Sequence, residues 1–197
     1  MPSEELVTGA RFLAHETLRE GQFDMINDGF KVISEGGFLL ANAPTGIGKT
    51  AAALSAALTV ARTGVGKHVI FMTGRQSQHR IVVDTVRNIN NRLESNEQEI
   101  TLVDMIGRES MCEYVDRTTG KCSCEQGTTE SESENRRAGL KELILSKPRH
   151  VDFSIKEASK RRVCAWATAR SAASDADILV CDYNHVFIES VRKASLA

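Results

Sequence analysis

The sequence predicts an α/β fold in which helices cover a parallel sheet. Short apolar runs alternate with longer stretches of helical periodicity over residues 37–103, and this alternation is typical of parallel sheets. A further apolar run at 176–181 is expected to return to the same sheet. Between them, residues 107–170 carry four of the five cysteines and break the alternation, which indicates a small inserted region.

The predicted elements follow one another in a regular order. Apolar side chains at helical spacing predict two helices within residues 11–35. The next elements are a strand at 37–43, a helix near 49–62, a strand at 68–72, a helix near 76–93 and a strand at 100–103. The polar stretch 125–135 is expected to be a solvated loop before a short helix at 140–145, and 176–184 forms the closing strand and its end.

The turn after the first predicted strand has the composition of a phosphate-binding P-loop. Two glycines allow a tight turn whose backbone N–H groups, with the N-terminus of the next helix, can face a phosphate. A lysine for the β- and γ-phosphates and a hydroxyl for magnesium follow directly, and we assign both residues a catalytic role. The common pattern starts with glycine where this chain has alanine; an ordinary strand-to-helix turn is the alternative. The predicted loop residues are Ala43, Pro44, Thr45, Gly46, Ile47, Gly48, Lys49 and Thr50.

Two polar stretches flank this unit of sequence. The amide of Gln22 can meet the edge of an adenine, although a solvated polar pair at a helix start explains it equally well. Residues 73–78 follow a predicted strand, where parallel sheets bind ligands. There Arg75 and Gln78 suit a phosphodiester backbone, and a helix cap with a surface turn is the alternative.

Four cysteines in the inserted region predict a metal centre. Cys112, Cys122, Cys124 and Cys164 are separated by nine, one and thirty-nine residues. Four thiolates can hold zinc or an iron–sulfur cluster. Structural zinc usually uses C-x-x-C pairs, which these cysteines lack, so the spacing favours a cluster, with zinc or four unconnected thiols as alternatives. Cys181 lies within an apolar run and is expected to be a buried thiol.

Composition limits the partners. A net charge of −1 and a pI near 6.5 give no overall attraction to nucleic acid. A local basic run could still provide it, and a solvated helix face is the alternative; its members are Lys156, Lys160, Arg161 and Arg162. No apolar run approaches the roughly 20 residues of a membrane span, so we expect no membrane partner and a cytoplasmic location.

The closing strand ends in Asp182, a position suited to holding magnesium. No glutamate follows it, so the usual general base for an attacking water is missing. An unrelated P-loop NTPase that uses Asp182 for magnesium is one hypothesis that this strand leaves open.

The order of these features resembles the XPD-like superfamily-two iron–sulfur DNA helicases, especially archaeal forms. The resemblance runs from about residue 13 to 191 and rests on Arg19-x-x-Gln22, the P-loop, residues 73–78, the four cysteines and Asp182-Tyr183-Asn184. It implies a RecA-like first motor domain interrupted by an iron–sulfur domain, in enzymes that use ATP and magnesium to move five-prime to three-prime on single-stranded DNA. By the same resemblance, Arg19 and Gln22 join the ATP site and the cysteines hold a 4Fe-4S cluster. DNA would then be contacted by Arg75, Gln78, Lys160, Arg161 and Arg162.

The resemblance also predicts the domain organisation. Residues 1–106 would be the first part of helicase domain 1, 107–170 the iron–sulfur insert, and 171–197 the returning strand and helix. Two departures are expected to matter: Cys122-x-Cys124 is tighter than the family spacing, and the 197 residues contain no Asp-Glu-Ala-His box, arch domain or second RecA-like domain. We therefore expect a fragment that is inactive alone. The alternative is a stand-alone nucleotide- and nucleic-acid-binding module with structural zinc and no turnover.

Overall fold

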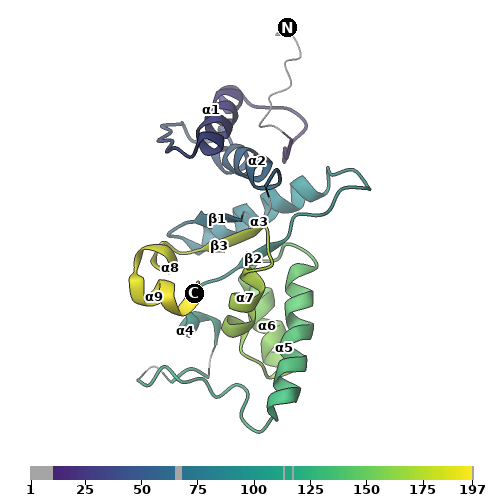
Figure 1. Ribbon diagram of the computed structural model, residues 1–197, viewed down its shortest axis with the longest axis vertical. Coiled ribbons are helices and arrows are strands. Elements are labelled where there is room, and N and C mark those ends of the chain that lie inside the picture. Colours follow the sequence, from purple (N-terminus) through teal and green to yellow (C-terminus); the bar gives the residue numbers. More distant parts are fainter. Residues whose placement is uncertain (1–10, 65–67, 113, 117, 197) are drawn as a thin grey trace. The chain divides into compact units, whose positions relative to one another are not determined.

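The protein is described by a computed structural model that covers residues 11–64, 68–112, 114–116 and 118–196 (Figure 1). The chain divides into two compact units. The first unit comprises residues 1–69 and 84–100, and the second comprises residues 70–83 and 101–197.

Two helices dominate the first unit. Helix α1 (Gln22–Glu35) packs against α2 (Lys49–Ala61). Small and aliphatic residues make up nearly all of α2, and eight of them are buried, so this helix forms the core of the unit. Helix α2 begins at the residue predicted from the sequence, directly after the glycine-rich turn.

Two predictions for this unit are wrong. Residues 11–20 form bends and turns, so residues 11–35 contain one helix and not two, although Phe12 and Ala14 are buried. Residues 37–43 form no strand, and the side chains of Phe38 and Leu40 are fully exposed. A strand needs a neighbouring strand for its backbone hydrogen bonds. Among the described residues of this unit, only Val69 belongs to any strand.

A three-stranded sheet organises the second unit. Its strands β1 (Val69–Met72), β2 (Leu102–Asp104) and β3 (Ile178–Cys181) lie in the order β1-β3-β2. Strands β2 and β3 are parallel, with Val103 opposite Leu179. Every residue of β3 is buried, which explains its unbroken apolar run. The predicted α/β class with a parallel sheet is confirmed.

Helices surround this sheet and share its core. Helix α3 (Gln76–Asn90) is divided between the two units. The other helices are α4 (Arg108–Met111), α5 (Glu130–Leu145), α6 (Val151–Arg161), α7 (Ala165–Ala173), α8 (Asn184–Phe187) and α9 (Glu189–Ser195). Side chains of α5, α6 and α7 join those of β2 and β3 in one apolar cluster that includes Val103, Leu140, Val151, Ala169 and Leu179.

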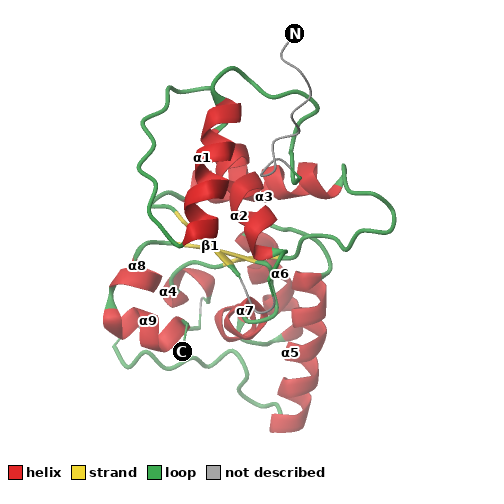
Figure 2. Ribbon diagram, turned by 45° about the horizontal axis from the view of Figure 1, so that its top comes forward, coloured by secondary structure: helices red, strands yellow, loops and turns green. Residues whose placement is uncertain are grey.

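One further boundary differs from the prediction. The stretch 125–135 is not wholly a loop, because α5 begins at Glu130. Thr129 caps this helix through the backbone N–H of Glu132, and the Glu132 carboxylate accepts in return from the backbone N–H of Thr129. Such a reciprocal capping box stabilises a polar helix start. The described residues between α4 and α5 form no long helix or strand (Figure 2).

Candidate functional site

The predicted P-loop forms a tight turn in the first unit. Gly46 and Gly48 have φ angles of 91° and 85°, in the left-handed region that favours glycine. Gly48 is the residue before α2, so the helix N-terminus follows the turn directly. The Lys49 ammonium donates to the carbonyl oxygens of Ala43 at 3.1 Å and Pro44 at 2.9 Å. The turn therefore presents a lysine and a helix N-terminus together, the chemistry that binds phosphate.

Gln22 and Arg19 support this turn from the start of α1. The buried Gln22 amide donates from Nε2 to the Gly48 carbonyl at 3.1 Å and accepts at Oε1 from the backbone N–H of Arg19 at 3.0 Å. The Arg19 guanidinium donates to the Gly46 carbonyl. A Cβ added at Gly48 would collide with Gln22 Nε2, and the φ of 85° also favours glycine there. Contact of Gln22 with adenine and of Arg19 with ATP stays a prediction.

Polar groups gather where the strands of the second unit end. Asp104 is the last residue of β2 and Asp182 follows β3, so the parallel pairing brings both to one edge of the sheet. The end of β1 meets the same edge, because the Thr73 backbone N–H donates to the Cys181 carbonyl at 3.1 Å. Thr73 Oγ1 also contacts Gln78 Oε1, while Arg75 is exposed. Any contact of Arg75 or Gln78 with DNA remains untested.

A buried histidine joins the two acids at this edge. His79 Nδ1 lies 2.5 Å from Asp104 Oδ1, and both side chains are fully buried. Its other ring nitrogen, Nε2, lies 3.9 Å from Asp182 Oδ1 and is a buried atom without a hydrogen-bond partner among the described residues. The second Asp104 oxygen accepts from the backbone N–H of Val151 at 2.8 Å, which anchors the start of α6. His185 lies close enough to Asp182 and His79 to interact with both. Burial lowers the pKa of His185, and the charge of Asp182 opposes that shift.

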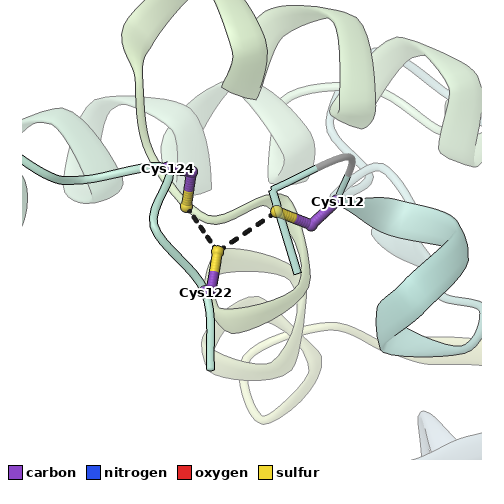
Figure 3. A group of neighbouring side chains, drawn as sticks. All are labelled: Cys112, Cys122 and Cys124. Carbon is purple, nitrogen blue, oxygen red and sulfur yellow. Dashed lines mark hydrogen bonds between the residues drawn. The ribbon is translucent and has the colours of Figure 1, made fainter. Parts of the chain in front are cut away.

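Three of the four predicted metal ligands converge in the second unit (Figure 3). The Cys122 sulfur lies 3.1 Å from that of Cys112 and 2.9 Å from that of Cys124. All three Sγ atoms lie within 4.8 Å of one another. Cys164 caps the N-terminus of α7, where its sulfur accepts from the Ala167 backbone N–H at 3.4 Å. It also interacts with the thiols of Cys122 and Cys124.

Burial and mutual repulsion make these thiols unequal. Burial raises the pKa of Cys112 to about 11 and also raises the pKa of Cys124 and of Cys164. Burial acts on Cys122 in the same direction, but hydrogen bonds from Cys124, Cys112 and Cys164 outweigh it and lower the pKa of Cys122. A metal ion that binds here must displace protons, as at any thiolate site. Cys181 is buried in β3, as predicted, and burial raises its pKa to about 12.

The space and charge beside the cysteines suit a bound group. A cavity of about 610 Å³ lies against Cys112 and Cys124, and its other wall includes Lys156, Lys160 and Arg162. Glu157 pairs with two cations of the basic run, reaching Lys160 Nζ at 2.6 Å and the Arg161 guanidinium. These two ion pairs lower the pKa of Glu157 to about 2. Two of the four cations in the basic run are thus already paired with a single carboxylate within α6.

Some residues of these sites were not expected from the sequence. His79, His150 and His185 are scattered along the chain, yet Asp104 or Asp182 interacts with each of them. The position of Asp104 directly after an apolar run is the same signal that singled out Asp182. Glu125 is the other omission; it contacts the backbone of Cys164, and its place next to Cys124 was the signal available.

Comparison with known proteins identifies the family. Residues 71–197, well over half of the chain, match the model of the DEAD_2 family, and the protein belongs to that family. The fold is similar to that of an XPD helicase, with a TM-score of 0.62 and 22% identity over 91% of this chain and 30% of the other. A truncated XPD is similar at a TM-score of 0.54 and 21% identity, over 89% of this chain and 48% of the other. The chain thus spans less than half the length of either match. No curated protein matches the sequence.

These findings confirm the resemblance of the fold to the first part of an XPD-like helicase. The P-loop lies before the residues that the family model matches. Among the residues that the structure describes, no helix has the length and apolar character needed to cross a bilayer.

Proposed function

We propose that this chain supplies the ATP-binding and DNA-binding part of an ATP-dependent DNA helicase that moves five-prime to three-prime on single-stranded DNA. The observation that carries the proposal is the turn at Gly46 and Gly48, which presents Lys49 at the N-terminus of α2 in a chain with an XPD-like fold. Lys49 and Thr50 would hold the β- and γ-phosphates and magnesium. Arg19 and Gln22 would support the loop from outside, with Gln22 also reaching adenine.

The P-loop can be tested by nucleotide binding. Removing the Lys49 ammonium deletes a charge-assisted donor worth about 1.5–3 kcal/mol, so Lys49→Ala should weaken ATP binding by at least about tenfold in calorimetry. Lys31→Ala is the matched control, because it removes the same charge from an exposed position on α1 of the same unit. Equal affinity in Lys49→Ala and Lys31→Ala would refute the P-loop assignment.

We further propose that Cys112, Cys122, Cys124 and Cys164 hold a 4Fe-4S cluster. The donor set fits, because three thiols converge, a fourth interacts with two of them, and a cavity lies beside them. Such a group would cross-link the segment 112–124 to the start of α7. The cysteines themselves contribute thiolates, and the buried ones must release their protons first.

Zinc is the second candidate, and one observation favours it. Ligand sulfurs around a single tetrahedral ion, with zinc–sulfur bonds of about 2.3 Å, lie about 3.8 Å apart. In a 4Fe-4S cluster each cysteine sulfur binds a different iron, so the ligand sulfurs lie farther apart than around one zinc ion. The Sγ–Sγ distances of 2.9 and 3.1 Å are closer to the spacing around a single ion. Protein purified without oxygen distinguishes the two: brown protein with iron and sulfide supports the cluster, and colourless protein with one zinc supports the ion. Cys112→Ser and Cys164→Ser should lose the metal, whereas the matched control Cys181→Ser should keep it.

We place the DNA contact on the exposed cations of the second unit. Arg75 and Gln78 follow β1. Lys160, Arg161 and Arg162 lie at the C-terminal end of α6, and Lys156 lies in the middle of that helix. Single-stranded DNA is the expected partner, bound through its backbone with little sequence preference. The arch domain and the second RecA-like domain of the family would complete the enzyme, so unwinding is proposed for the whole helicase and not for these 197 residues alone.

A further inference from the structure

A carboxylate next to one cysteine holds the backbone of another. Glu125 follows Cys124 directly, and its Oε1 accepts a hydrogen bond of 3.0 Å from the backbone N–H of Cys164. Thirty-nine residues lie between those two cysteines in the sequence, and they include α5 and α6. The Glu125 backbone is itself fixed, because its carbonyl accepts from the Thr128 hydroxyl at 2.7 Å.

An arginine from α5 holds the same carboxylate. Arg137 Nε donates to Glu125 Oε1 at 2.7 Å, and the terminal nitrogen of Arg137 contacts Oε2. Two-point contact fixes the plane of a carboxylate better than a single bond does. The Glu125 side chain is 20% exposed and that of Arg137 40%, so this ion pair adds little stability by Coulomb attraction. The pair acts chiefly by fixing the orientation of the Glu125 carboxylate that accepts from Cys164.

The arginine also carries charge toward the cysteines. Its pKa is raised first by the hydrogen bond with Glu125 and further by Cys164 and Cys124. Four thiolates around an iron–sulfur cluster or a divalent ion leave excess negative charge at a partly buried site, and a fixed cation nearby offsets it. Cys164 needs such support most, because the compact sulfur group consists of Cys112, Cys122 and Cys124.

We infer that Glu125 and Arg137 are positioning residues for the metal centre, which keep Cys164 within reach of the other three thiols. The inference rests on the proposed metal centre and goes beyond the cysteines themselves. Without the pair, the site should become a three-cysteine site whose fourth ligand is mobile. Partners of this kind around other metal sites typically change affinity by about 10–100-fold.

The first test uses metal-free protein, in which the pair should hold Cys164 even without a ligand. Iodoacetamide labelling followed by mass spectrometry gives the reaction rate of each cysteine. Cys164 is 6% exposed, and Glu125→Ala should raise its labelling rate several-fold. The matched controls Glu134→Ala and Arg136→Met change charges on α5 without touching Glu125 and should leave that rate unchanged. Cys181, buried in β3, should stay unlabelled wherever the fold is intact.

The second test measures retention of the native metal. Protein purified without oxygen is treated with EDTA, and metal loss is followed by absorbance and by metal analysis. Glu125→Ala and Arg137→Met should lose metal about 10–100-fold faster than the parent chain and Arg136→Met. If Glu125→Ala exposes Cys181 and so fails to fold, Glu125→Gln decides instead. Its amide oxygen can still accept from Cys164, but it cannot form the charged pair with Arg137, and faster metal loss is again expected.

The outcomes separate this inference from the proposed function. A parent chain that holds metal, with unchanged Cys164 labelling and unchanged metal loss in the Glu125 and Arg137 variants, overturns the positioning role and leaves the metal centre standing. A parent chain purified without any bound metal overturns the metal centre itself. Faster Cys164 labelling and faster metal loss in the same variants support both.

Discussion

The imidazole of His79 lies 2.5 Å from the carboxylate of Asp104, and water reaches neither side chain. The pair joins α3 to the end of β2, and Asp104 also holds the first N–H of α6. Two polar side chains thus replace apolar packing where three elements meet. Their buried position makes the interaction measurable, because removing one partner leaves the other without compensation.

Asp104→Ala should therefore be strongly destabilising. Loss of the carboxylate leaves a buried imidazole and the Val151 N–H unpaired, which should cost about 3–5 kcal/mol. The combined His79→Leu and Asp104→Leu variant should cost much less than the sum of the single changes, because both polar groups are removed together. Urea unfolding followed by circular dichroism measures all three. Additive costs would show that the two side chains do not stabilise one another.

His185 should make stability depend on pH. Burial lowers its pKa below the ordinary 6.5, so the unfolded chain takes up a proton at a higher pH than the folded chain. Above pH 6.5 the residue is neutral in both states and costs nothing. As pH falls below that value, the unfolded state binds more protons and the free energy of unfolding decreases. Thermal unfolding of the parent and of His185→Phe between about pH 5 and 8, the range in which histidines titrate, should show a smaller decrease in the variant. Identical pH profiles would remove His185 as the cause.

Gly48→Ala should damage the P-loop. The residue has a left-handed φ of 85°, and the new Cβ would meet Gln22 Nε2. The strain should cost about 1–2 kcal/mol and weaken ATP binding with it. Gly139→Ala is the matched control, since Gly139 lies within α5 with open space around the position of a Cβ. That change should stabilise the helix by about 0.5–1 kcal/mol. A harmless Gly48→Ala would mean that the loop adopts another conformation.

DNA binding should depend on Lys156 and Arg162 more than on their neighbours. Glu157 pairs with Lys160 and Arg161, whereas neither Lys156 nor Arg162 forms an ion pair among the described residues. Changing Lys156 and Arg162 to Gln should flatten the dependence of log affinity for single-stranded DNA on log salt by about 0.7 for each phosphate that the protein no longer neutralises. The same change at Lys160 and Arg161 is the matched comparison and should have a smaller effect. An unchanged slope in both double variants would mean that DNA binds to another part of the chain.

These 197 residues alone should not hydrolyse ATP at a detectable rate. Asp182 can hold magnesium, but Tyr183 follows it where a general base would help. We expect the second RecA-like domain of the whole helicase to supply an arginine finger to the ATP site. Loss of such a finger alone lowers the hydrolysis rate by a factor of about 10³–10⁵. Phosphate release is measured with and without single-stranded DNA, with Lys49→Ala as the control for contaminating enzymes. Turnover that disappears in Lys49→Ala would contradict this expectation and make Asp182 a working acid of the site.

Local patterns predicted some of these features and missed others for physical reasons. The start of α2 at Lys49 follows from the glycines before it, and the burial of β3 follows from its apolar run. The residue pattern of the capping box at Thr129 and Glu132 is present in the sequence and could have predicted the start of α5. The polar composition around it favoured a loop instead. These features depend on neighbours in sequence.

Contacts across the fold could not be predicted in this way. The approach of His79 to Asp104 and Asp182 depends on the strand order β1-β3-β2, which no spacing along the chain encodes. The cysteines could be grouped by residue type alone, but the hydrogen bond from Cys164 to Glu125 required the packing of α5 and α7. The incorrect prediction of a strand at 37–43 has the same cause. A strand needs a neighbouring strand for its hydrogen bonds, and the residues of the segment itself do not specify that neighbour.

That unpaired segment has a practical consequence for work with the protein. Residues 37–43 read Gly-Phe-Leu-Leu-Ala-Asn-Ala, without charge or proline, and expose three large apolar side chains. Such segments recruit identical copies through backbone pairing. Solubility at high concentration should therefore be governed by these seven residues more than by the net charge of −1, and a lysine in place of Leu40 should raise the concentration at which the protein precipitates.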